Sequence, residues 1–448
     1  MSRLFKKFNS VLKLLKKVQS KVFYSIAFYP VLLSSAFFIV ALLLLYAENL
    51  EFVTIFKKKV PYLLIQNHET ARTILSTLFG SILSLTVFSF TMVMVVLSQA
   101  SSNFSPRLLP GLVSNKKHQI ILGFYIGTLT FTMMVLISLG AYGSDSNAVS
   151  FSVMVASIFG LFCIGLFVYF IHSISQAIQI HNIIDRIYNN SKKLLNEEIK
   201  EQQNSKETLN VVENENQYWK LLKSHKTGYY RSFDHSLLQE SIKKKSNILE
   251  VLPYADQHVW KGSPILKIKE PISNEEMEEL ALCFYILSNR HEDDSGVGGM
   301  IKLTEVAVKA LSPGINDPGT AINAISKIGQ LLHKSLQIKP KTHIRVSGFD
   351  IEIIYNKISP EELMRIIIQP IREYAKSDSE VTYDLLDMLL YLQRSNEIII
   401  EYRNAITEEI ENLCNDLKEN ITNNIDVNRI LALLQPPLLT TPDKKQRV

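Results

Sequence analysis

The stretch that decides the fold runs from Ser146 to Ile184 and reads SNAVSFSVMVASIFGLFCIGLFVYFIHSISQAIQIHNII. None of its 39 residues is Asp, Glu, Lys or Arg. A helix of about 20 apolar residues is long enough to cross the hydrocarbon core of a bilayer. Because soluble core helices rarely run so long without a charge, the stretch predicts a membrane-spanning helix near 151–171.

Three more stretches without charged residues lie ahead of it, and they predict three further spans near 23–46, 74–97 and 120–141. In lipid the backbone must satisfy its own hydrogen bonds, so helices are the expected form. The first span has a basic start like that of a signal peptide. Its apolar part exceeds the usual length of about 7–15 residues and no clear cleavage site follows, which favours a retained helix. The sequence therefore predicts four transmembrane helices within residues 23–171 and excludes an ordinary soluble enzyme.

The positive charge of the chain is concentrated at its N-terminus. The formal net charge of the 448 residues is +5, yet the first 21 residues contain seven basic side chains and no acidic one. The rest of the chain therefore has a charge of −2, which gives no indication of a nucleic-acid partner. Apolar residues recur at helical spacing within 1–22. This segment is either an amphipathic helix on an acidic leaflet or a basic flank that only sets topology.

Basic residues in short loops indicate which side of the membrane each loop occupies. Arg107, Lys116 and Lys117 in the second loop agree with the basic N-terminal segment, whereas Lys57–Lys59 in the first loop disagree. The majority predicts a multi-pass protein of the bacterial inner membrane with both termini in the cytoplasm.

The region after the fourth span predicts a mixed α+β domain. Residues 172–225 are interpreted as a helical stalk, 226–435 as a cytosolic α+β domain with a helical C-terminus, and 436–448 as a flexible tail. Strands are expected near 229–234, 247–253 and 257–268, including a strand pair around Trp260–Ile265, with a hairpin at 343–355. Helices are expected at 236–244, 274–285, 299–311, 318–334, 360–376, 380–394, 396–419 and 427–434. The three cysteines have no spacing typical of disulfides or zinc sites.

The segment Ala310-Leu311-Ser312-Pro313-Gly314-Ile315-Asn316-Asp317-Pro318 resembles the signature of a bacterial family of predicted membrane proteins of unknown function. A second match lies around Ser105, Pro106 and Arg107, at the exit of the second span. The resemblance implies four membrane helices followed by a cytosolic domain, and it implies no established activity.

The signature also has a purely structural interpretation. Ser312-Pro313-Gly314 ends one helix, and Asp317 begins the next as its N-cap with Pro318 at the first helical position. A buried, tight helix–loop–helix corner would explain these residues. The alternative is an anion site at the N-terminus of the second helix, which Asp317 would oppose.

Two adjacent segments have residue types suited to ligand binding. His291-Glu292-Asp293-Asp294 offers imidazole and carboxylate ligands for a divalent metal, although such acidic clusters are more often solvated loops. Gly296-Val297-Gly298-Gly299 is a turn of the kind that can cradle a phosphate, but the Lys-Ser/Thr of a P-loop is missing. No catalytic constellation is found, so we expect no cofactor and no enzymatic activity.

Hydroxyl side chains line one face of the second predicted span. Thr77, Ser84, Thr91 and Ser98 recur every seven residues, and Ser81 and Ser102 lie between or beyond them. Such a face either packs helices closely or lines a hydrated pathway in an oligomer. The spans contain no ionisable residue in their cores, which argues against an ion-coupled pump and not against a passive channel.

These observations lead to two functional hypotheses. The first is an oligomeric channel-like or transport-related membrane protein with a cytosolic regulatory domain, whose partners are the lipid bilayer and further copies of itself. The alternative is a non-transporting scaffold or sensor whose cytosolic domain binds a protein or a small ligand.

Overall fold

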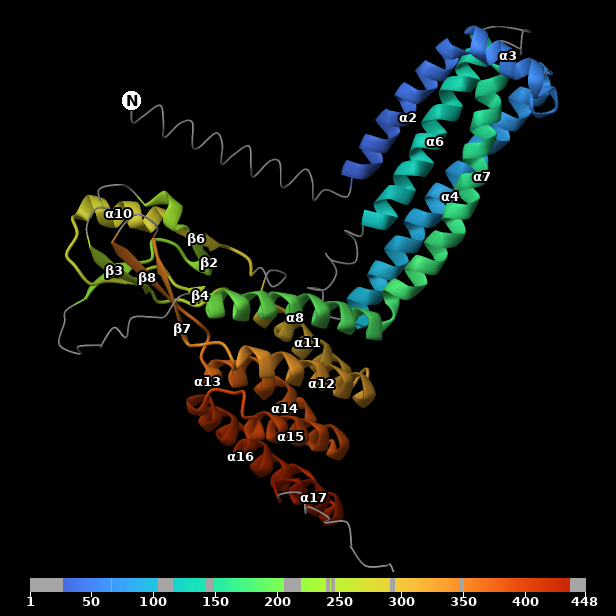
Figure 1. Cartoon of the computed structure of the whole chain (residues 1–448). Helices are drawn as coiled ribbons and strands as arrows, with labels where there is room; N and C mark the ends of the chain where they lie inside the picture. The colour runs from blue at the N-terminus through green and yellow to red at the C-terminus, as the bar shows by residue number, and fades with distance from the viewer. Residues whose placement is uncertain are drawn as a thin grey trace, which may run out of the picture. The chain divides into compact units, whose positions relative to one another are not determined.

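A computed structural model of the chain describes residues 27–65, 67–103, 116–141, 149–204, 219–238, 242, 246–290, 295–346 and 350–435. The chain divides into two compact units, with the boundary between Asn182 and Ile183 (Figure 1). The predicted N-terminal amphipathic helix and the C-terminal tail lie outside the described residues.

The first unit contains four long helices, and each is long and apolar enough to cross a membrane. They are α2 (Phe28–Ala47), α4 (His68–Asn103), α6 (Lys116–Ala141) and α7 (Ser150–Ile178). The predicted fold class is thus confirmed. Both α4 and α7 extend past the predicted spans, because uncharged polar residues such as Gln99 and His172 continue each helix beyond its most apolar part. Asn67, for example, caps α4 by accepting a hydrogen bond from the Thr70 N–H at 2.9 Å.

Small residues on α6 allow α2 to approach it closely. A Cβ atom added at Gly123 would lie 2.7 Å from Leu33 Cδ1, and one at Gly127 would lie 2.8 Å from Phe37 Cγ. Glycines four residues apart on a helix bring two backbones together and maximise van der Waals contact in the membrane.

A short amphipathic connector joins α2 to α4 and was not predicted from the sequence. It consists of α3 (Glu51–Lys59) and the 3₁₀ turn η1 (Pro61–Leu63). Figure 1 shows α3 across the end of the four-helix unit. Val53 is buried there, and the ring of Phe56 lies edge-on to Phe151 of α7 with centroids 5.5 Å apart.

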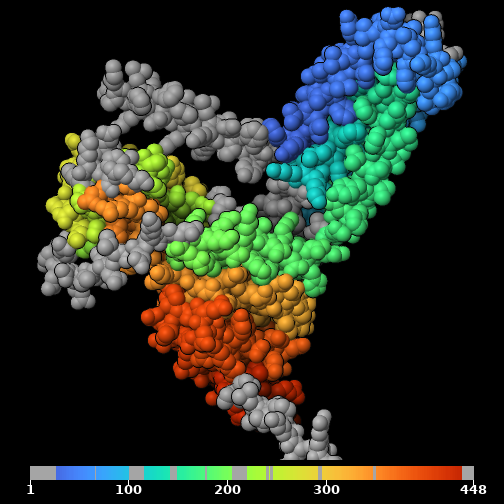
Figure 2. All heavy atoms as spheres, in the orientation of Figure 1, coloured from blue at the N-terminus to red at the C-terminus, as the bar shows by residue number. Residues whose placement is uncertain are grey.

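The second unit begins with a long amphipathic helix. The helix α8 (Ile180–Asn204) follows a break at Gln179, whose backbone is extended. It packs on α11 (Gly296–Ala310) and α12 (Pro318–Ser335), and Figure 2 shows this layering. Part of the stalk expected at 172–225 is α8, whose apolar stripe is buried in the second unit.

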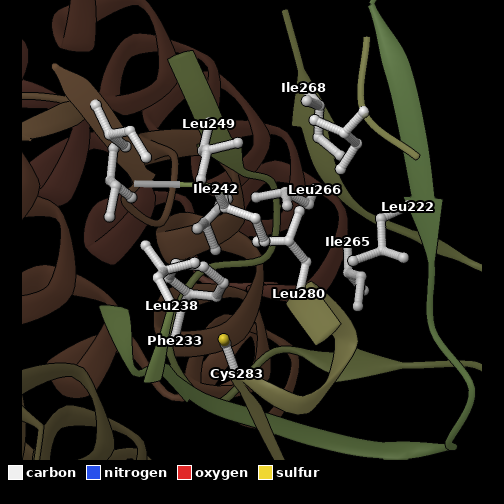
Figure 3. Close-up of a cluster of buried hydrophobic side chains, with 14 of the residues drawn as sticks. Leu222, Phe233, Leu238, Ile242, Leu249, Ile265, Leu266, Ile268, Leu280 and Cys283 are labelled. Carbon is white, nitrogen blue, oxygen red and sulfur yellow. The ribbon is translucent and has the colours of Figure 1, made fainter. Parts of the chain in front are cut away.

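Among the described residues, eight strands form two small sheets. The first has the order β1-β5-β3-β8-β7 and the second β4-β2-β6; only β3 and β8 pair in parallel. The strands are β1 (Lys220–Lys223), β2 (Gly228–Phe233), β3 (Asn247–Val251), β4 (His258–Val259), β5 (Pro264–Ile268), β6 (Phe284–Leu287), β7 (Lys341–Arg345) and β8 (Ile351–Asn356). Their shared apolar core includes Leu249, Leu266 and Leu280, labelled in Figure 3.

Several local predictions in this region are confirmed and others are wrong. Strands near 229–234 and 247–253 and the β7–β8 hairpin form as expected, although the hairpin turn at Gly348 lies outside the described residues. The strand pair expected around Trp260–Ile265 is wrong, since β4 pairs with β2 while β5 pairs with β1 and β3. The end of the helix expected at 274–285 is also wrong, because β6 begins at Phe284. Of the helix expected at 236–244, the described residues include a 3₁₀ turn at His235–Leu237.

The remaining helices agree with the sequence. The helix α10 (Asn274–Leu282) begins with a capping box, in which Ser273 and Glu276 satisfy each other's backbone N–H groups. The helical C-terminus contains α13 (Pro360–Leu363), a π-helical turn (Met364–Ile368), α14 (Gln369–Ala375), α15 (Ser379–Arg394), α16 (Arg403–Asn420) and α17 (Asn424–Leu431). Its third predicted helix begins later than expected, at Arg403, after a 3₁₀ turn at Ile400–Tyr402.

Candidate functional site

The hydroxyl face predicted on the second span is exposed along α4. Thr77, Ser81, Ser84, Thr91 and Ser98 are all exposed in the chain. Ser102 belongs to the helix, but its side chain lies outside the described part of the structure. The structure therefore places the five described hydroxyls on an open helix surface.

A second series with the same spacing forms the buried face of α4. Leu75, Ile82, Ser89 and Val96 recur every seven residues and pack against the other long helices. Each lies two residues from a member of the hydroxyl series, which corresponds to about 200° around a helix. The hydroxyls thus point away from the four-helix core, and they do not serve helix packing within the chain.

Two of these hydroxyls are bonded to their own helix. Ser84 Oγ donates to the carbonyl of Gly80 at 3.0 Å, and Thr91 Oγ1 donates to the carbonyl of Val87 at 2.9 Å. Their donors are thereby satisfied, while lone pairs remain available to a neighbour or a solute. Gly80 lies beside them, and a Cβ atom added there would meet nothing within 4 Å. The face is consequently open to a close approach from outside the chain.

The second unit contains a small cavity of about 80 Å³, lined by apolar and polar side chains. Its walls include Ser295, Tyr402 and Tyr254, together with the ion pair between Lys357 and Glu198. This volume holds several water molecules, since one water needs about 10–15 Å³. No local pattern predicts the ion pair, because its members are 159 residues apart.

The tyrosines of the cavity are uncharged at neutral pH. Burial, with the carboxylate of Glu362, raises the pKa of Tyr254 to about 12, and its hydroxyl donates to Glu362 Oε1 at 2.9 Å. Burial also raises the pKa of Tyr402 to about 12. The cavity therefore offers hydroxyl groups and one balanced ion pair, a lining suited to a small polar molecule.

The glycine-rich turn has a packing role that explains its composition. A Cβ atom added at Gly296 would lie 2.4 Å from Leu195 Cγ, and one at Gly299 would lie 1.6 Å from Ser191 Oγ. Ser295 caps α11 by accepting from the Gly298 N–H at 3.0 Å. These glycines allow α11 to lie directly against α8, so the phosphate-cradle interpretation is not needed.

The other ligand-binding hypothesis concerns His291–Asp294, which lie outside the described residues. Within the described ranges, no group of three or more His, Cys, Asp or Glu side chains is placed to hold a metal ion.

The α11–α12 corner has the expected capping but not the expected burial. Asp317 is the N-cap of α12 and accepts from the Thr320 N–H at 3.1 Å, with Pro318 at the start of the helix. Residues 313–317 are nevertheless exposed, so the predicted buried corner is wrong. The loop is closed by its own backbone, where the Asp317 N–H donates to the Ala310 carbonyl at 2.9 Å. The second match, Ser105-Pro106-Arg107, lies outside the described residues.

A buried acid near the α2–α4 connector was missed by the sequence analysis. The side chain of Glu48 is only 1% exposed, and its carboxylate lies 2.6 Å from Lys57 Nζ. It also accepts from the Ser152 N–H in the first turn of α7 at 2.6 Å. Glu48 is the first charged residue after a charge-free stretch, and this position could have indicated that it holds the connector to α7.

Comparison with known proteins gives one match. A family model described as a predicted membrane protein (DUF2254) matches residues 24–391. No curated protein and no solved structure matches the chain.

Proposed function

The chain belongs to the DUF2254 family of predicted membrane proteins, and from this premise we propose that it forms a homo-oligomer with a passive, channel-like pathway. The hydroxyl face of α4 lines the pathway, and the second unit lies in the cytoplasm of a bacterial cell and regulates it. The proposed role is not enzymatic.

One observation supports this proposal above all: the hydroxyl face of α4 is opposite to its buried face. The hydroxyls of this face are unused in packing within the chain and could line a hydrated path, while exposed Val87 and Phe88 border them. The charge-free stretches supply no carboxylate relay, which favours passive over coupled transport.

The test measures solute release from liposomes containing the full-length protein. Thr77→Val, Ser84→Ala and Thr91→Val together remove three hydroxyls while preserving volume. If each hydroxyl stabilises a passing solute by about 1 kcal/mol, the triple variant lowers the release rate about a hundredfold. Thr86→Val is the matched control, since Thr86 is half-buried on the other side of α4 and its replacement leaves release unchanged.

Liposomes that stay tight around folded, oligomeric protein would refute the pathway. A Gly80→Cys variant tests the assembly separately, because its thiol lies on the same open surface. Disulfide formation between copies is expected on oxidation in the membrane.

The cavity in the second unit favours the alternative function of a sensor for a small polar ligand. A ligand that hydrogen-bonds Tyr254 should raise the unfolding temperature of the protein, and Tyr254→Phe should remove this rise. If a ligand gives this rise in unfolding temperature and the liposomes release no solute, the protein is a sensor and not a channel.

A further inference from the structure

The α3–η1 connector presents an apolar surface that no other described part of the chain covers. Phe52 is 78% exposed and Tyr62 82% exposed, and Ile55 and Leu63 are about half exposed at 48% and 53%. The connector also carries exposed Lys58 and Lys59. Large apolar side chains gathered in this way mark a surface that contacts something else.

Contacts within the first unit place the connector at one end of the membrane helices. It lies between the last residue of α2 and the first residue of α4. Glu48 links it to the beginning of α7, through Lys57 on one side and the Ser152 N–H on the other. The helix α2 has 20 residues, or about 30 Å, which equals the hydrocarbon thickness of a bilayer. The end of α2, and the connector with it, is therefore expected at the membrane surface; Figure 1 shows α3 at this end of the four helices.

The apolar arc of α3 is wider than the part that packs on the protein. Val53 is buried, Phe56 is half-buried against Phe151, and the arc continues around the helix to the exposed Phe52 and Ile55. Lys59 lies four residues after Ile55 on the same arc. From this position its long side chain can reach the lipid headgroups. Thr54 occupies the opposite, polar side, and Glu51 borders the arc one turn before Ile55.

We propose that the α3–η1 connector is an interfacial lipid-binding element of this protein. Phe52, Ile55, Tyr62 and Leu63 enter the boundary between headgroups and acyl chains, and Lys58 and Lys59 bind anionic headgroups. Aromatic residues beside lysines are typical of such interfacial helices. A second copy is a poorer occupant, because it would bring the same lysines into the contact. The proposal requires that the long helices cross the bilayer, and it does not depend on conduction.

The test uses the full-length protein in lipid nanodiscs and a tryptophan probe. Trp219 and Trp260 are the two native tryptophans, and they are replaced with Phe. In this background Phe52→Trp should give blue-shifted emission that shallow lipid quenchers reduce more than deep ones. Thr54→Trp is the control on the polar side of α3, and its emission should stay water-like. Tyr62→Trp gives an independent reading from η1 if Phe52→Trp fails to fold.

The lipid charge provides the second half of the test. A quencher on an anionic headgroup should reduce the emission of Phe52→Trp more than the same quencher on a zwitterionic headgroup. The double change Lys58→Gln and Lys59→Gln should abolish this difference. Water-like emission from both probes would overturn the proposal. A second pair of results would also overturn the proposal: lipid quenchers leave the emission unchanged, and Phe52→Cys forms a disulfide between two copies. A second copy of the chain would then cover the surface.

Discussion

Individual buried charges reveal how the two ends of the connector are held. Glu48 accepts from the first turn of α7, where the helix dipole favours a carboxylate, and its negative charge is balanced by Lys57. The side chains of the pair are 1% and 18% exposed, so water screens the attraction weakly. One of the three lysines between α2 and α4 is therefore neutralised within the protein.

Replacing Lys57 with Met should destabilise the first unit by about 2–4 kcal/mol, because it leaves the buried Glu48 carboxylate without its counter-charge. The loss is measured as a lower midpoint of denaturation in detergent micelles. Lys58→Met removes the same charge one residue further on, at an exposed site, and should change stability by less than about 0.5 kcal/mol. Equal effects of the two changes would contradict a specific role for the pair.

Replacing Gly299 with Ala should destabilise the second unit to a similar extent. Alanine there places its Cβ atom 1.6 Å from Ser191 Oγ, so α11 and α8 must move apart. We expect a loss of about 2–3 kcal/mol in the free energy of unfolding. Gly314→Ala, where nothing lies within 4 Å, is the control and should have little effect. If the role is packing, adding Ser191→Gly should recover most of the loss; a failure of this rescue would point to another role for Gly299.

At the scale of elements, one acid connects three strands of the larger sheet. Glu250 on β3 is buried and lies 3.0 Å from Lys341 on β7 and 3.4 Å from Lys267 on β5. Burial alone would raise its pKa, but the hydrogen bond and charge of Lys341, helped by Lys267, hold the pKa below its ordinary value.

This lowered pKa predicts how the sheet responds to acid. A carboxyl group whose pKa is lower in the folded state adds stability above its unfolded pKa, and the contribution disappears as the pH falls through the folded value. Glu250→Gln should therefore reduce the free energy of unfolding at pH 7 by about 1–2 kcal/mol and have progressively less effect below about pH 4.5. Hydrogen exchange of β3 and β8 across this pH range measures the change. Glu270→Gln, at an exposed site after β5, should show no such dependence.

The sequence predicts elements well where the signal is local. The four long helices follow from runs without charge, and the cap of α12 follows from Asp317 and Pro318. The connector helix α3 was missed because its nine residues are neither apolar throughout nor flanked by a capping side chain.

Pairing and exposure depend on contacts that no local pattern records. The strands β4 and β5 are close in sequence, yet Gly262 turns the chain with a φ of 91° and sends them to different sheets. The seven-residue spacing of the hydroxyls on α4, which begins at Thr77, can be read from the sequence. Whether that face packs against the other helices depends on their positions, which the sequence pattern does not contain. The packing role of Gly299 likewise required the position of Ser191.

At the scale of the whole molecule, the distribution of charge sets the expected orientation. Seven basic residues precede the first span, and Arg107, Lys116 and Lys117 lie between α4 and α6. The lysines of the connector favour the opposite orientation. Glu48 balances the charge of Lys57, which weakens this contrary evidence. With four spans the N-terminal segment and the second unit are expected on the same side, and the basic majority predicts that this side is the cytoplasm.

Cysteine labelling of the full-length protein in spheroplasts tests this orientation. The three native cysteines are buried, so the background reaction with an impermeant maleimide should be low. Thr54→Cys, on the exposed polar side of α3, should react in intact spheroplasts, because the connector faces outward. Ile425→Cys is 70% exposed on α17 and should react only after the membrane is permeabilised. The reverse pattern would place both termini outside, and labelling of both sites in intact spheroplasts would contradict an odd number of spans between them, namely α4, α6 and α7.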